Sequence, residues 1–218
     1  MARRTKEEAE RTRAAVLDAA VQVFLAQGVA RATLEDVARA AGVTRGAVYW
    51  HFRDKLDLFL AIDARARLPA EELLAEVAGH DGPDPLGELA RVLTERLVAL
   101  EADAERRRYL TVVLVRCEYT EEMAPALDRQ RRADAALRAE LQRIFESAAA
   151  ARPGGLAPAW RPGTAALALH ALVTGLINAW LRGGPGDLGL ATEGANAVRA
   201  FLVCVGADGA AAEADGAR

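Results

Sequence analysis

Hydrophobic residues recur at intervals of three and four along most of the chain, the spacing that places them on one face of an α-helix. Near the N-terminus this apolar stripe consists of Val16, Leu17, Ala20, Val23 and Phe24. Thr5 and Glu8 have the spacing of a helix capping box, and Gly28 suits a left-handed helix end. The pattern therefore predicts a first helix over residues 6–27.

Three further helix starts follow closely. Thr33 and Asp36 form a second capping signal before a short helix at 34–41, which Gly42 closes. The other two starts are Thr44 before a helix at 45–51, and Asp54 with Asp57 before a fourth helix that contains Leu56, Phe59 and Leu60. This pattern predicts a three-helix unit at the N-terminus, followed by a connecting helix.

The rest of the chain predicts longer helices separated by glycine and proline. Residues 79–85 (GHDGPDP) indicate a loop, and YLTVVLV (109–115), although strand-like, is expected to be helical because helices surround it. One helix is marked by a stripe of Leu86, Leu89, Leu93, Leu97 and Leu100, and a long helix runs from Thr120 to RPGG at 152–155 with Leu137, Leu141, Ile144 and Ala148 on one face. An uncharged helix at 163–181 follows, and after a break at 183–187 the last helix contains Val198, Leu202 and Val205. Together they predict an all-α fold of about nine helices.

The segment 163–181 (GTAALALHALVTGLINAWL) contains no Asp, Glu, Lys or Arg and is nearly long enough to span a bilayer. However, His170, Thr174 and Asn178 follow one another at intervals of four, which places three polar groups on one face. A lipid-facing helix would leave these groups without partners. We therefore expect a helix that is buried on all sides in a soluble protein.

Composition agrees with a helical, non-enzymatic protein. Hydrophobic residues make up 52% of the 218 residues and aromatic residues only 5%. The net charge is −3, but residues 1–58 hold ten basic and eight acidic residues, and the remainder holds 18 basic and 23 acidic. A mildly basic head on an acidic body suits a DNA-binding module joined to another domain. His51, His80 and His170 are scattered and no catalytic or metal-binding set can be assembled, so we expect neither an enzyme nor a cofactor.

The two cysteines and the two chain ends carry little further information. Cys117 and Cys204 lie in apolar runs, and their spacing fits neither a metal site nor a redox pair, so we expect buried free thiols in a reducing cytoplasm. The charged N-terminus has no apolar segment behind it, so we do not expect a signal peptide there. The tail at 207–218 has little to bury and is expected to be disordered.

The helices at 34–41 and 45–51 have the features of a helix-turn-helix. Such a motif needs a small residue where the helices touch and a glycine at the turn, which Ala38 and Gly42 supply. Val37, Val43 and Val48 provide the apolar underside, and Thr44, Arg45, Tyr49 and His51 can bond to phosphates or base edges. An ordinary pair of packed helices would show the same periodicity and caps, so these features leave both interpretations open.

Residues 33–59 (TLEDVARAAGVTRGAVYWHFRDKLDLF) resemble the DNA-binding signature of TetR-family repressors, above all through GVTRGAVYWHF. The opening MARRTKEEAERTRAAVLDAA resembles the AcrR-like branch, whose members control multidrug efflux pumps. Weaker similarity continues at DPLGEL (84–89), RCEYTEEM (116–123) and TGLINAWL (174–181) and so covers most of the chain. The resemblance implies a homodimeric repressor that binds a palindromic operator and is released by hydrophobic or aromatic ligands.

Carried over to this chain, the family pattern implies roles for individual residues. Arg45 would read a base edge in the major groove, and Gly46 would let the backbone approach closely. Thr33 would hold a phosphate through its hydroxyl group and the N–H groups at the helix start. Further phosphate contacts would come from Thr44, Tyr49, His51 and Lys55, and from a basic arm of Arg3, Arg4 and Lys6. Trp50 and Phe52 are expected to pack, although Trp50 could also lie against a sugar.

We therefore expect a DNA-binding domain at 1–54, a ligand-sensing and dimerisation domain at 55–206, and the tail at 207–218. The resemblance implies that the last two helices pair with their copies as a four-helix bundle. The apolar stripe assigned to that interface is Leu169, Leu172, Leu176, Trp180, Val198, Leu202 and Val205. Pro69 falls inside the expected fourth helix, where it predicts a kink or break near residues 65–68.

The polar stripe of the uncharged helix would then face a mostly apolar pocket for a small molecule. The candidate lining residues are Leu93, Arg96, Leu110, Leu114, Leu137, His170, Thr174 and Asn178. Few of them are acidic, which favours a neutral or weakly anionic aromatic or amphiphilic ligand. Ordinary core packing is the alternative for each residue, and a regulator of another pathway with a different or vestigial pocket is the alternative for the whole protein.

Overall fold

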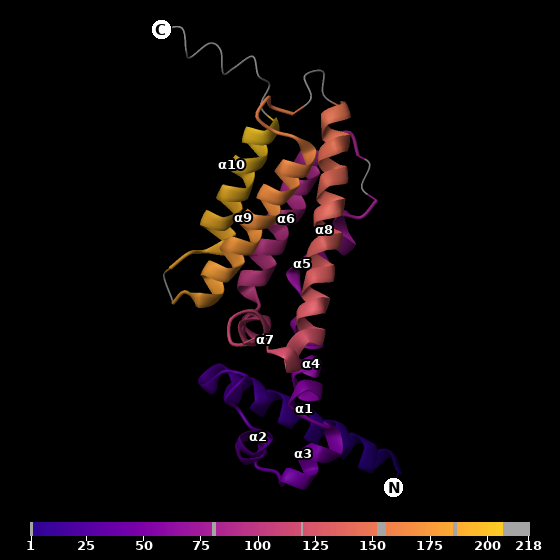
Figure 1. Ribbon diagram of the computed structural model, residues 1–218, viewed down its shortest axis with the longest axis vertical. Helices are drawn as coiled ribbons and strands as arrows, with labels where there is room; N and C mark the ends of the chain where they lie inside the picture. Colours follow the sequence, from indigo (N-terminus) through magenta and orange to yellow (C-terminus); the bar gives the residue numbers. More distant parts are fainter. Residues whose placement is uncertain (1, 80–81, 119, 152–155, 185–186, 207–218) are drawn as a thin grey trace. The chain divides into compact units, whose positions relative to one another are not determined.

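A computed structural model of the protein describes residues 2–79, 82–118, 120–151, 156–184 and 187–206, with the backbone alone at residues 2–5 (Figure 1). Within these ranges every regular element is helical, which confirms the all-α fold. Ten α-helices are described there, because the expected fourth helix is broken in two. They are α1 (Ala2–Gln27), α2 (Leu34–Ala41), α3 (Arg45–His51), α4 (Lys55–Ala66), α5 (Pro69–Val77), α6 (Pro85–Ala102), α7 (Ala104–Leu114), α8 (Ala124–Ala151), α9 (Pro162–Arg182) and α10 (Ala195–Gly206).

The chain folds into two compact units, each built from two stretches of sequence. The first unit holds residues 1–68 and 104–130, and the second holds 69–103 and 131–218. This division differs from the expected domains at 1–54 and 55–206, which stay a prediction. The reason is that α4 packs against both α1 and α7, so the expected connecting helix belongs to the first unit.

Helix α1 is the centre of the first unit, and α2, α3, α4 and α7 all contact it. In the view of Figure 1, α2 and α3 lie below α1. The expected stripe is buried: Val16, Leu17, Ala20 and Phe24 are 0% exposed and Val23 is 8% exposed. The helix begins at Ala2 rather than at Lys6, so Thr5 lies inside it and is not its cap. Gly28 ends the helix as expected, with a φ of 81°.

The expected break before Pro69 is present. Helix α4 ends at Ala66, Arg67 takes a left-handed conformation with a φ of 47°, and α5 begins at Pro69. Proline is tolerated in the first turn of a helix, where its missing N–H has no intrahelical partner to lose. The guanidinium group of Arg106 in α7 donates to the carbonyl oxygens of Ala66 at 3.3 Å and of Arg67 at 2.7 Å. Arg106 is 8% exposed and closes the carboxyl end of α4.

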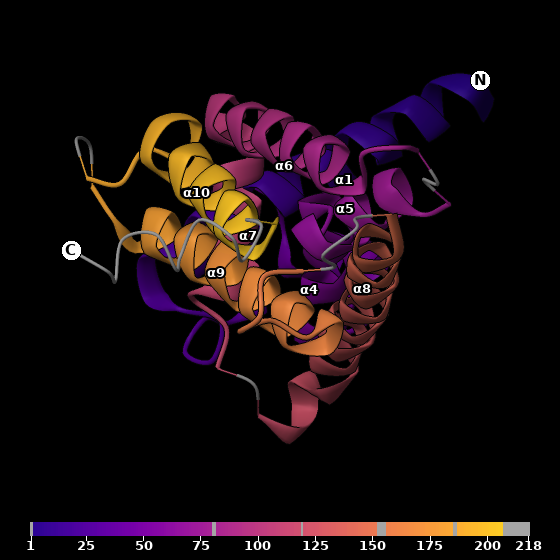
Figure 2. The same cartoon turned by 90° about the horizontal axis from the view of Figure 1, so that it is seen from above.

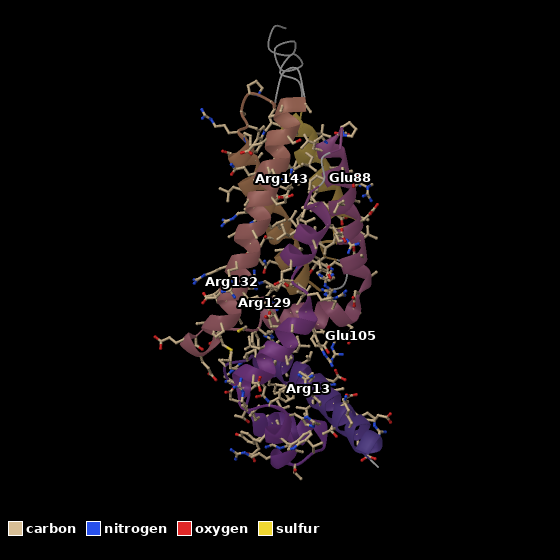
Figure 3. All side chains as sticks on the ribbon, turned by 90° about the vertical axis from the view of Figure 1, so that its right-hand side faces the viewer. Arg13, Glu88, Glu105, Arg129, Arg132 and Arg143 are labelled. Carbon is tan, nitrogen blue, oxygen red and sulfur yellow. The ribbon has the colours of Figure 1, made fainter. Side chains whose placement is uncertain are left out.

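A buried carboxylate joins α4 to the beginning of α8. Asp63 is 1% exposed, and Arg129, labelled in Figure 3, pairs with it at 2.5 Å. A second set of bonds joins α1, α4 and α7. Arg65 donates to the Tyr109 hydroxyl group at 3.1 Å, and that hydroxyl group donates to Asp18 at 3.3 Å. These contacts hold the carboxyl-terminal part of α4 within the first unit.

In the second unit α6, α10 and α9 lie side by side, as Figure 2 shows from above. The leucine stripe of α6 is buried as expected: Leu86, Leu89, Leu93, Leu97 and Leu100 are at most 4% exposed. Helix α8 begins at Ala124, after a 3₁₀ turn at Glu121–Met123, and not directly at Thr120. In the first unit, residues 109–114 continue α7, so the strand-like segment is helical as expected. The segments 152–155 and 207–218 lie outside the described residues.

Helix α9 does not have the expected environment. By length and composition it could cross a membrane, yet only 33% of its most apolar stretch is buried. Leu167 is 54% exposed, and Ala171, Thr174 and Gly175 are exposed on the same face. The expectation of a helix buried on all sides is therefore wrong for the single chain. Because the segment has apolar residues all round, its periodicity could not show which face is covered.

The Asp63–Arg129 pair leads to a test of stability. Asp63→Asn should lower the free energy of unfolding by about 2–3 kcal/mol, because it leaves a largely buried guanidinium group without its carboxylate. Glu95→Gln is the matched control: Glu95 is more than half exposed beside Arg91, and its loss should cost less than about 1 kcal/mol. Urea unfolding at one protein concentration measures both. Equal losses in the two variants would contradict a structural role for the buried pair.

Candidate nucleic-acid interface

Helices α2 and α3 form the expected helix-turn-helix, with the ends closed as the sequence predicted. The Asp36 N–H donates to the Thr33 hydroxyl group at 3.1 Å, and the Thr33 N–H donates to the Asp36 carboxylate at 3.2 Å. At the turn Gly42 has a φ of 66°, a conformation that other residues adopt only with strain. Thr44 accepts a hydrogen bond from the Ala47 N–H at 3.2 Å and so begins α3.

The underside of this helix pair is apolar and fixes the orientation of α3. The buried residues are Val37 and Val48 at 0%, Phe52 at 2% and Ala38 at 4% exposure. Val43, expected among them, is half-buried. Arg13 of α1 lies over the Phe52 ring, with 5.0 Å between its Cζ atom and the ring centroid. Because this side is packed against α1, the opposite side of α3 faces solvent.

The outer face of α3 carries Arg45, Gly46, Tyr49 and Trp50, all exposed. Tyr49 is 44% exposed and Trp50 is 72% exposed. The expectation that Trp50 packs is therefore wrong. Its recorded ring contact is edge-on to His51, with centroids 4.5 Å apart and planes at 86°. Both aromatic rings are available to sugars and phosphates, and Phe52 alone of the expected packing pair is interior.

His51 is half-buried at the end of α3. Burial lowers the pKa of its imidazole ring, and the positive charge of Arg13 lowers it further. The ring is therefore neutral near pH 7 and can donate one hydrogen bond. A phosphate against the ring would favour the protonated form, so the expected phosphate contact is chemically compatible with this site.

Thr33 and Lys55, both expected at phosphates, already have partners in the free protein. The Thr33 hydroxyl group donates to the Asp36 carboxylate at 2.6 Å, and this bond lowers the pKa of Asp36. A phosphate at this helix start would meet the negative charge of that carboxylate. The Lys55 ammonium group donates to the Ala30 carbonyl oxygen at 2.9 Å, which ties α4 to the loop after α1. Phosphate contacts by Thr33 and Lys55 stay predictions.

The sequence interpretation missed two exposed cations beside α3. The side chain of Arg53, just after α3, is 85% exposed, and that of Arg39, in the last turn of α2, is 72% exposed. Arg53 lies 3.6 Å from the Asp57 carboxylate, and Arg39 lies 3.3 Å from the Asp36 carboxylate. The signal available for Arg53 was its place directly after α3. The side chains of Arg3 and Arg4 lie outside the described residues.

The leucines expected to line a ligand pocket are parts of the two cores. Leu93 and Leu137 are 2% and 4% exposed in the second unit. Leu110, which is fully buried, and Leu114, which is half-buried, belong to the first unit. The expected lining residues therefore divide between the cores of the two units.

The polar stripe of α9 is also arranged differently from the expectation. His170 faces Asp134 of α8, with 3.2 Å between its Nε2 atom and the carboxylate. Thr174 is exposed, which corrects the expectation that it looks inward. The Asn178 side chain donates to the Thr174 carbonyl oxygen at 2.9 Å, within its own helix. Of the three polar residues, only His170 meets a side chain of another helix in these contacts.

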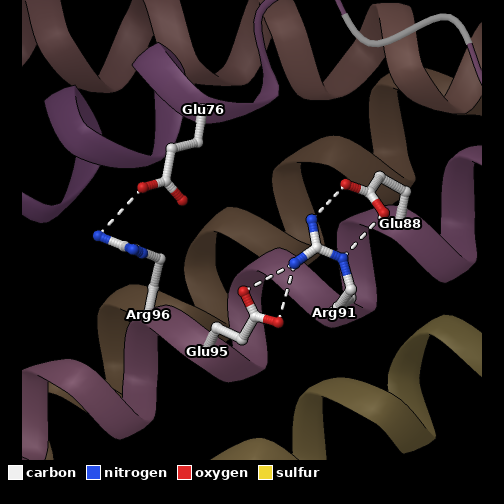
Figure 4. A network of polar contacts seen from close by, with 5 residues as sticks. All are labelled: Glu76, Glu88, Arg91, Glu95 and Arg96. Carbon is white, nitrogen blue, oxygen red and sulfur yellow. Dashed lines mark hydrogen bonds and ion pairs between the residues drawn. The ribbon is translucent and has the colours of Figure 1, made fainter.

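Helix α6 carries two groups of ion pairs, shown in Figure 4. Arg96 pairs with Glu76 of α5 at 3.0 Å, and Arg91 lies between Glu88 and Glu95. The Nε atom of Arg96 is buried and has no hydrogen-bond partner in the part of the chain that the structure describes. Arg96 therefore keeps one donor available inside the second unit.

A small cavity of about 20 Å³ lies in the second unit. It is lined by Val77, Gly82, Pro85, Glu88, Leu89, Val92 and Ile144. Its volume is close to that of one water molecule, whereas small-molecule pockets measure about 300–1,000 Å³. None of its lining residues belongs to the expected pocket, so this cavity is not the one that the sequence suggested.

Most of the stripe assigned to a dimer interface is interior to the single chain. Leu169, Trp180, Val198, Leu202 and Val205 are at most 4% exposed, and Leu172 and Leu176 are half-buried. Side chains already covered by their own chain have no surface to offer a partner, so the assignment is wrong for the five buried residues. They pack where α9, α10 and α6 meet.

The cysteines differ from each other more than expected. Cys117 is half-buried, and burial raises the pKa of its thiol to about 11, with a further contribution from the charge of Asp63. Cys204 is exposed on α10, which corrects the expectation that both thiols are buried. It follows Val203, which is 71% exposed. Together with Leu167 of α9, these residues leave apolar surface open on the last two helices.

Gly46 provides a test of close approach at the outer face of α3. A Cβ atom at this position would meet only the Thr44 hydroxyl oxygen, at 3.9 Å. Gly46→Ala should therefore fold at least as stably as the native protein, gaining up to about 1 kcal/mol from helix propensity. Its affinity for DNA should fall by about tenfold or more, because the methyl group occupies the space of the groove wall.

Gly42→Ala is the contrasting variant, since its left-handed backbone should cost about 1 kcal/mol. Thermal unfolding and DNA titration measure the two quantities separately. Unchanged DNA affinity of Gly46→Ala would show that the backbone of α3 does not approach the duplex here.

Comparison with known proteins places this helix-turn-helix in a family. Residues 16–62 match the family described as "Bacterial regulatory proteins, tetR family", and residues 84–204 match "MAATS-type transcriptional repressor, C-terminal region". The transcriptional repressor BepR of Brucella suis biovar 1 is 44% identical over 84% of this chain and 87% of its own length. The transcriptional regulator TtgR of Pseudomonas putida is 40% identical over 83% of this chain and 85% of its own.

Solved structures agree with the sequence comparison. NalD, described as the secondary repressor of the MexAB-OprM multidrug efflux pump in Pseudomonas aeruginosa, superposes with a TM-score of 0.75 at 37% identity and covers 93% of this chain and 99% of its own. SmeT, solved as a complex with triclosan, has a TM-score of 0.71 at 30% identity and covers 91% of this chain and 93% of its own. SmeT is described as the repressor of the Stenotrophomonas maltophilia multidrug efflux pump SmeDEF. The chain therefore belongs to the tetR family of bacterial regulatory proteins, whose members are regulators and not enzymes, and it is a transcriptional repressor of the TetR type.

Proposed function

We propose that this repressor works in the cytoplasm as a homodimer, binds a palindromic operator, controls a multidrug efflux pump operon, and is released by hydrophobic or aromatic effectors. The observation that carries the DNA-binding part is the outer face of α3. It is built on a fixed apolar underside and displays Arg45, an unobstructed Gly46 and two exposed aromatic rings. The efflux-pump assignment is supported by the descriptions of NalD and SmeT, which share at least 30% of their residues with the chain.

The proposed base contact is made by Arg45, and phosphate contacts surround it. Arg45 is exposed at the start of α3, and a guanidinium group can bond to guanine O6 and N7 at once. Thr44, Tyr49, His51, Lys55 and the arm residues Arg3 and Arg4 are proposed at phosphates, with Thr33 at the start of α2. Arg53 and Trp50 join this set because the structure leaves both open to solvent.

The dimer is proposed to form through the outward faces of α9 and α10. Repressors of this family bind operator DNA as dimers, and the chain exposes apolar residues on these two helices. The face comprises Leu167, Ala171 and Gly175 of α9 and Ala200, Val203 and Cys204 of α10. It replaces the buried stripe that the sequence suggested. A second copy would cover it through a twofold axis, since the same patch then serves both chains.

The effector is proposed to bind inside the second unit, against α6, α8 and α9. The interior there is apolar, and His170 and the free Arg96 Nε donor can fix a polar group of a ligand. A donor of this kind suits the neutral or weakly anionic aromatic molecule expected from the sequence. The complex of SmeT with triclosan, at 30% identity, supports the class of ligand. The described cavity, at about 20 Å³, is too small for such a molecule, so the proposed effector site is not this cavity.

That small volume also favours a second candidate function. That function is a TetR-type regulator of another pathway, whose vestigial pocket admits no effector. The two functions differ in their response to ligands: a vestigial pocket leaves operator binding unchanged by any effector. The same titration therefore separates them.

The first test of the proposed function is linkage between effector and operator. The protein should select a twofold-symmetric duplex from a randomised pool and bind it as a dimer. Triclosan should then bind the free protein about 5- to 150-fold more tightly than the operator complex, because linkage is reciprocal. Calorimetry with and without the selected duplex measures both affinities.

Two variants of α6 locate the effector in this experiment. Arg96→Met should weaken triclosan binding and leave operator affinity unchanged. Arg91→Met, which removes the ion pairs with Glu88 and Glu95 on the same helix, should alter neither. If triclosan and related aromatic compounds bind equally with and without operator, the effector-released repressor gives way to the second candidate.

The second test concerns assembly. Val203→Glu and Leu167→Glu should each raise the dimer dissociation constant more than tenfold, because every dimer would bury two unpaired carboxylates. Val98→Glu is the matched control, since Val98 is also exposed, at 45%, but lies on α6. Sedimentation equilibrium measures the constants. If both variants dimerise with the native dissociation constant, the interface does not lie on this face of α9 and α10.

A further inference from the structure

Arg45 and Tyr49 lie one helical turn apart on the exposed side of α3 and contact each other directly. The Arg45 Nη2 atom donates to the Tyr49 hydroxyl oxygen at 3.2 Å. The Cζ atom of Arg45 also lies 5.2 Å from the centroid of the Tyr49 ring. The guanidinium group therefore rests against the hydroxyl end of an aromatic ring, with a hydrogen bond and a cation–π contact at once.

This contact restricts a side chain that would otherwise be free. An exposed arginine samples many rotamers, and ordering it on binding costs affinity. Bidentate recognition of a base edge needs the guanidinium plane in one orientation. Glu35 of α2 attracts the same guanidinium group through its charge, which adds to the preference for this position.

The Tyr49 hydroxyl group can also donate a hydrogen bond. It accepts from Arg45, and its own proton remains available for an acceptor, since a phenol can do both. A hydroxyl group that accepts from a cation is polarised and becomes a stronger donor. A phosphate oxygen placed against Tyr49 would therefore be linked through one oxygen atom to the group that reads the base.

We propose that Tyr49 is a positioning residue for Arg45: it holds the guanidinium group ready for the base edge and couples that contact to a phosphate. This inference rests on the proposed function of Arg45 as the base-reading residue. It differs from the role of an independent phosphate contact, in which Tyr49 would strengthen binding to every duplex alike and without reference to Arg45.

A double-mutant cycle tests the proposal. The probes are a duplex that the native protein selects from a randomised pool, and the same duplex with both half-sites scrambled. Tyr49→Phe keeps the ring and removes the hydroxyl group. It should reduce the ratio of the two affinities by about three- to tenfold in the native background, a usual size for coupled neighbours. In the Arg45→Ala background the same change should alter the ratio less than about twofold.

Trp50→Phe is the matched control, because Trp50 is an exposed aromatic residue of the same helix whose recorded ring contact is with His51. Its effect should be the same with and without Arg45. Equal weakening of both duplexes by Tyr49→Phe, or an equal effect in both backgrounds, would overturn the proposal and leave Tyr49 as an independent contact. The base-reading role of Arg45 fails separately, if Arg45→Ala alone leaves the affinity ratio unchanged.

A second readout needs no DNA. In the free protein the Nε–H order parameter of Arg45, measured by NMR relaxation, should fall in Tyr49→Phe and stay at the native value in Trp50→Phe. A positioning role requires this difference, because the orientation must exist before the duplex arrives. An order parameter that is unchanged by loss of the hydroxyl group would refute positioning even if DNA affinity were reduced.

Discussion

The carboxyl end of α4 imposes the constraint on which the rest of the structure depends. The chain cannot continue as one helix into Pro69, so the carbonyl groups of the buried Ala66 and of Arg67 have no partners within a continuing helix. Arg106 satisfies both with one buried guanidinium group. Because a buried carbonyl without a donor is costly, α4 and α7 must come together, although forty residues of sequence separate the bonded groups. The first unit is therefore assembled from two distant stretches of the chain.

The chain passes between the two units after residues 68, 103 and 130. The first passage lies just beyond the break at Arg67, whereas the third lies within the unbroken helix α8 (Ala124–Ala151). Arg129 lies one residue before the last residue of the first unit, Gln130, and pairs with Asp63 of α4. A rotation of α8 would therefore act on α4 through a side chain as well as through the backbone, and α4 begins directly after α3.

The sequence was informative wherever the controlling interaction is local. The caps at Thr33, Thr44 and Asp54, the left-handed glycine at Gly42 and the break before Pro69 all depend on a few neighbouring residues, and each is present. The start of α1 was misplaced because Thr5 can stand inside a helix as well as cap one. Whether Arg3, Arg4 and the other proposed contacts touch DNA is not a property of local sequence.

The sequence was less informative about which apolar residues are buried and which are exposed. In α9 neither side carries a charge, so an apolar stripe that packs in the core looks the same as one that remains open, and the buried and exposed stripes were exchanged. Trp50 was misassigned for a related reason: a large aromatic residue usually indicates packing, and only the neighbours in space show that none covers it. The contacts of Arg106 and Arg129 depend on residues far away in sequence and left no periodic signal.

The exposed face of α9 affects the stability of the single chain before it assembles or binds DNA. Each newly made chain carries this helix, which has a mean hydropathy of 1.5 over its most apolar stretch and only a third of that stretch buried. In the proposed dimer a second copy covers this surface, so the single chain is the form that exposes apolar area to chaperones, membranes or proteases. On that proposal, dilution raises the share of the exposed single chain, so the stability of the repressor depends on its own concentration.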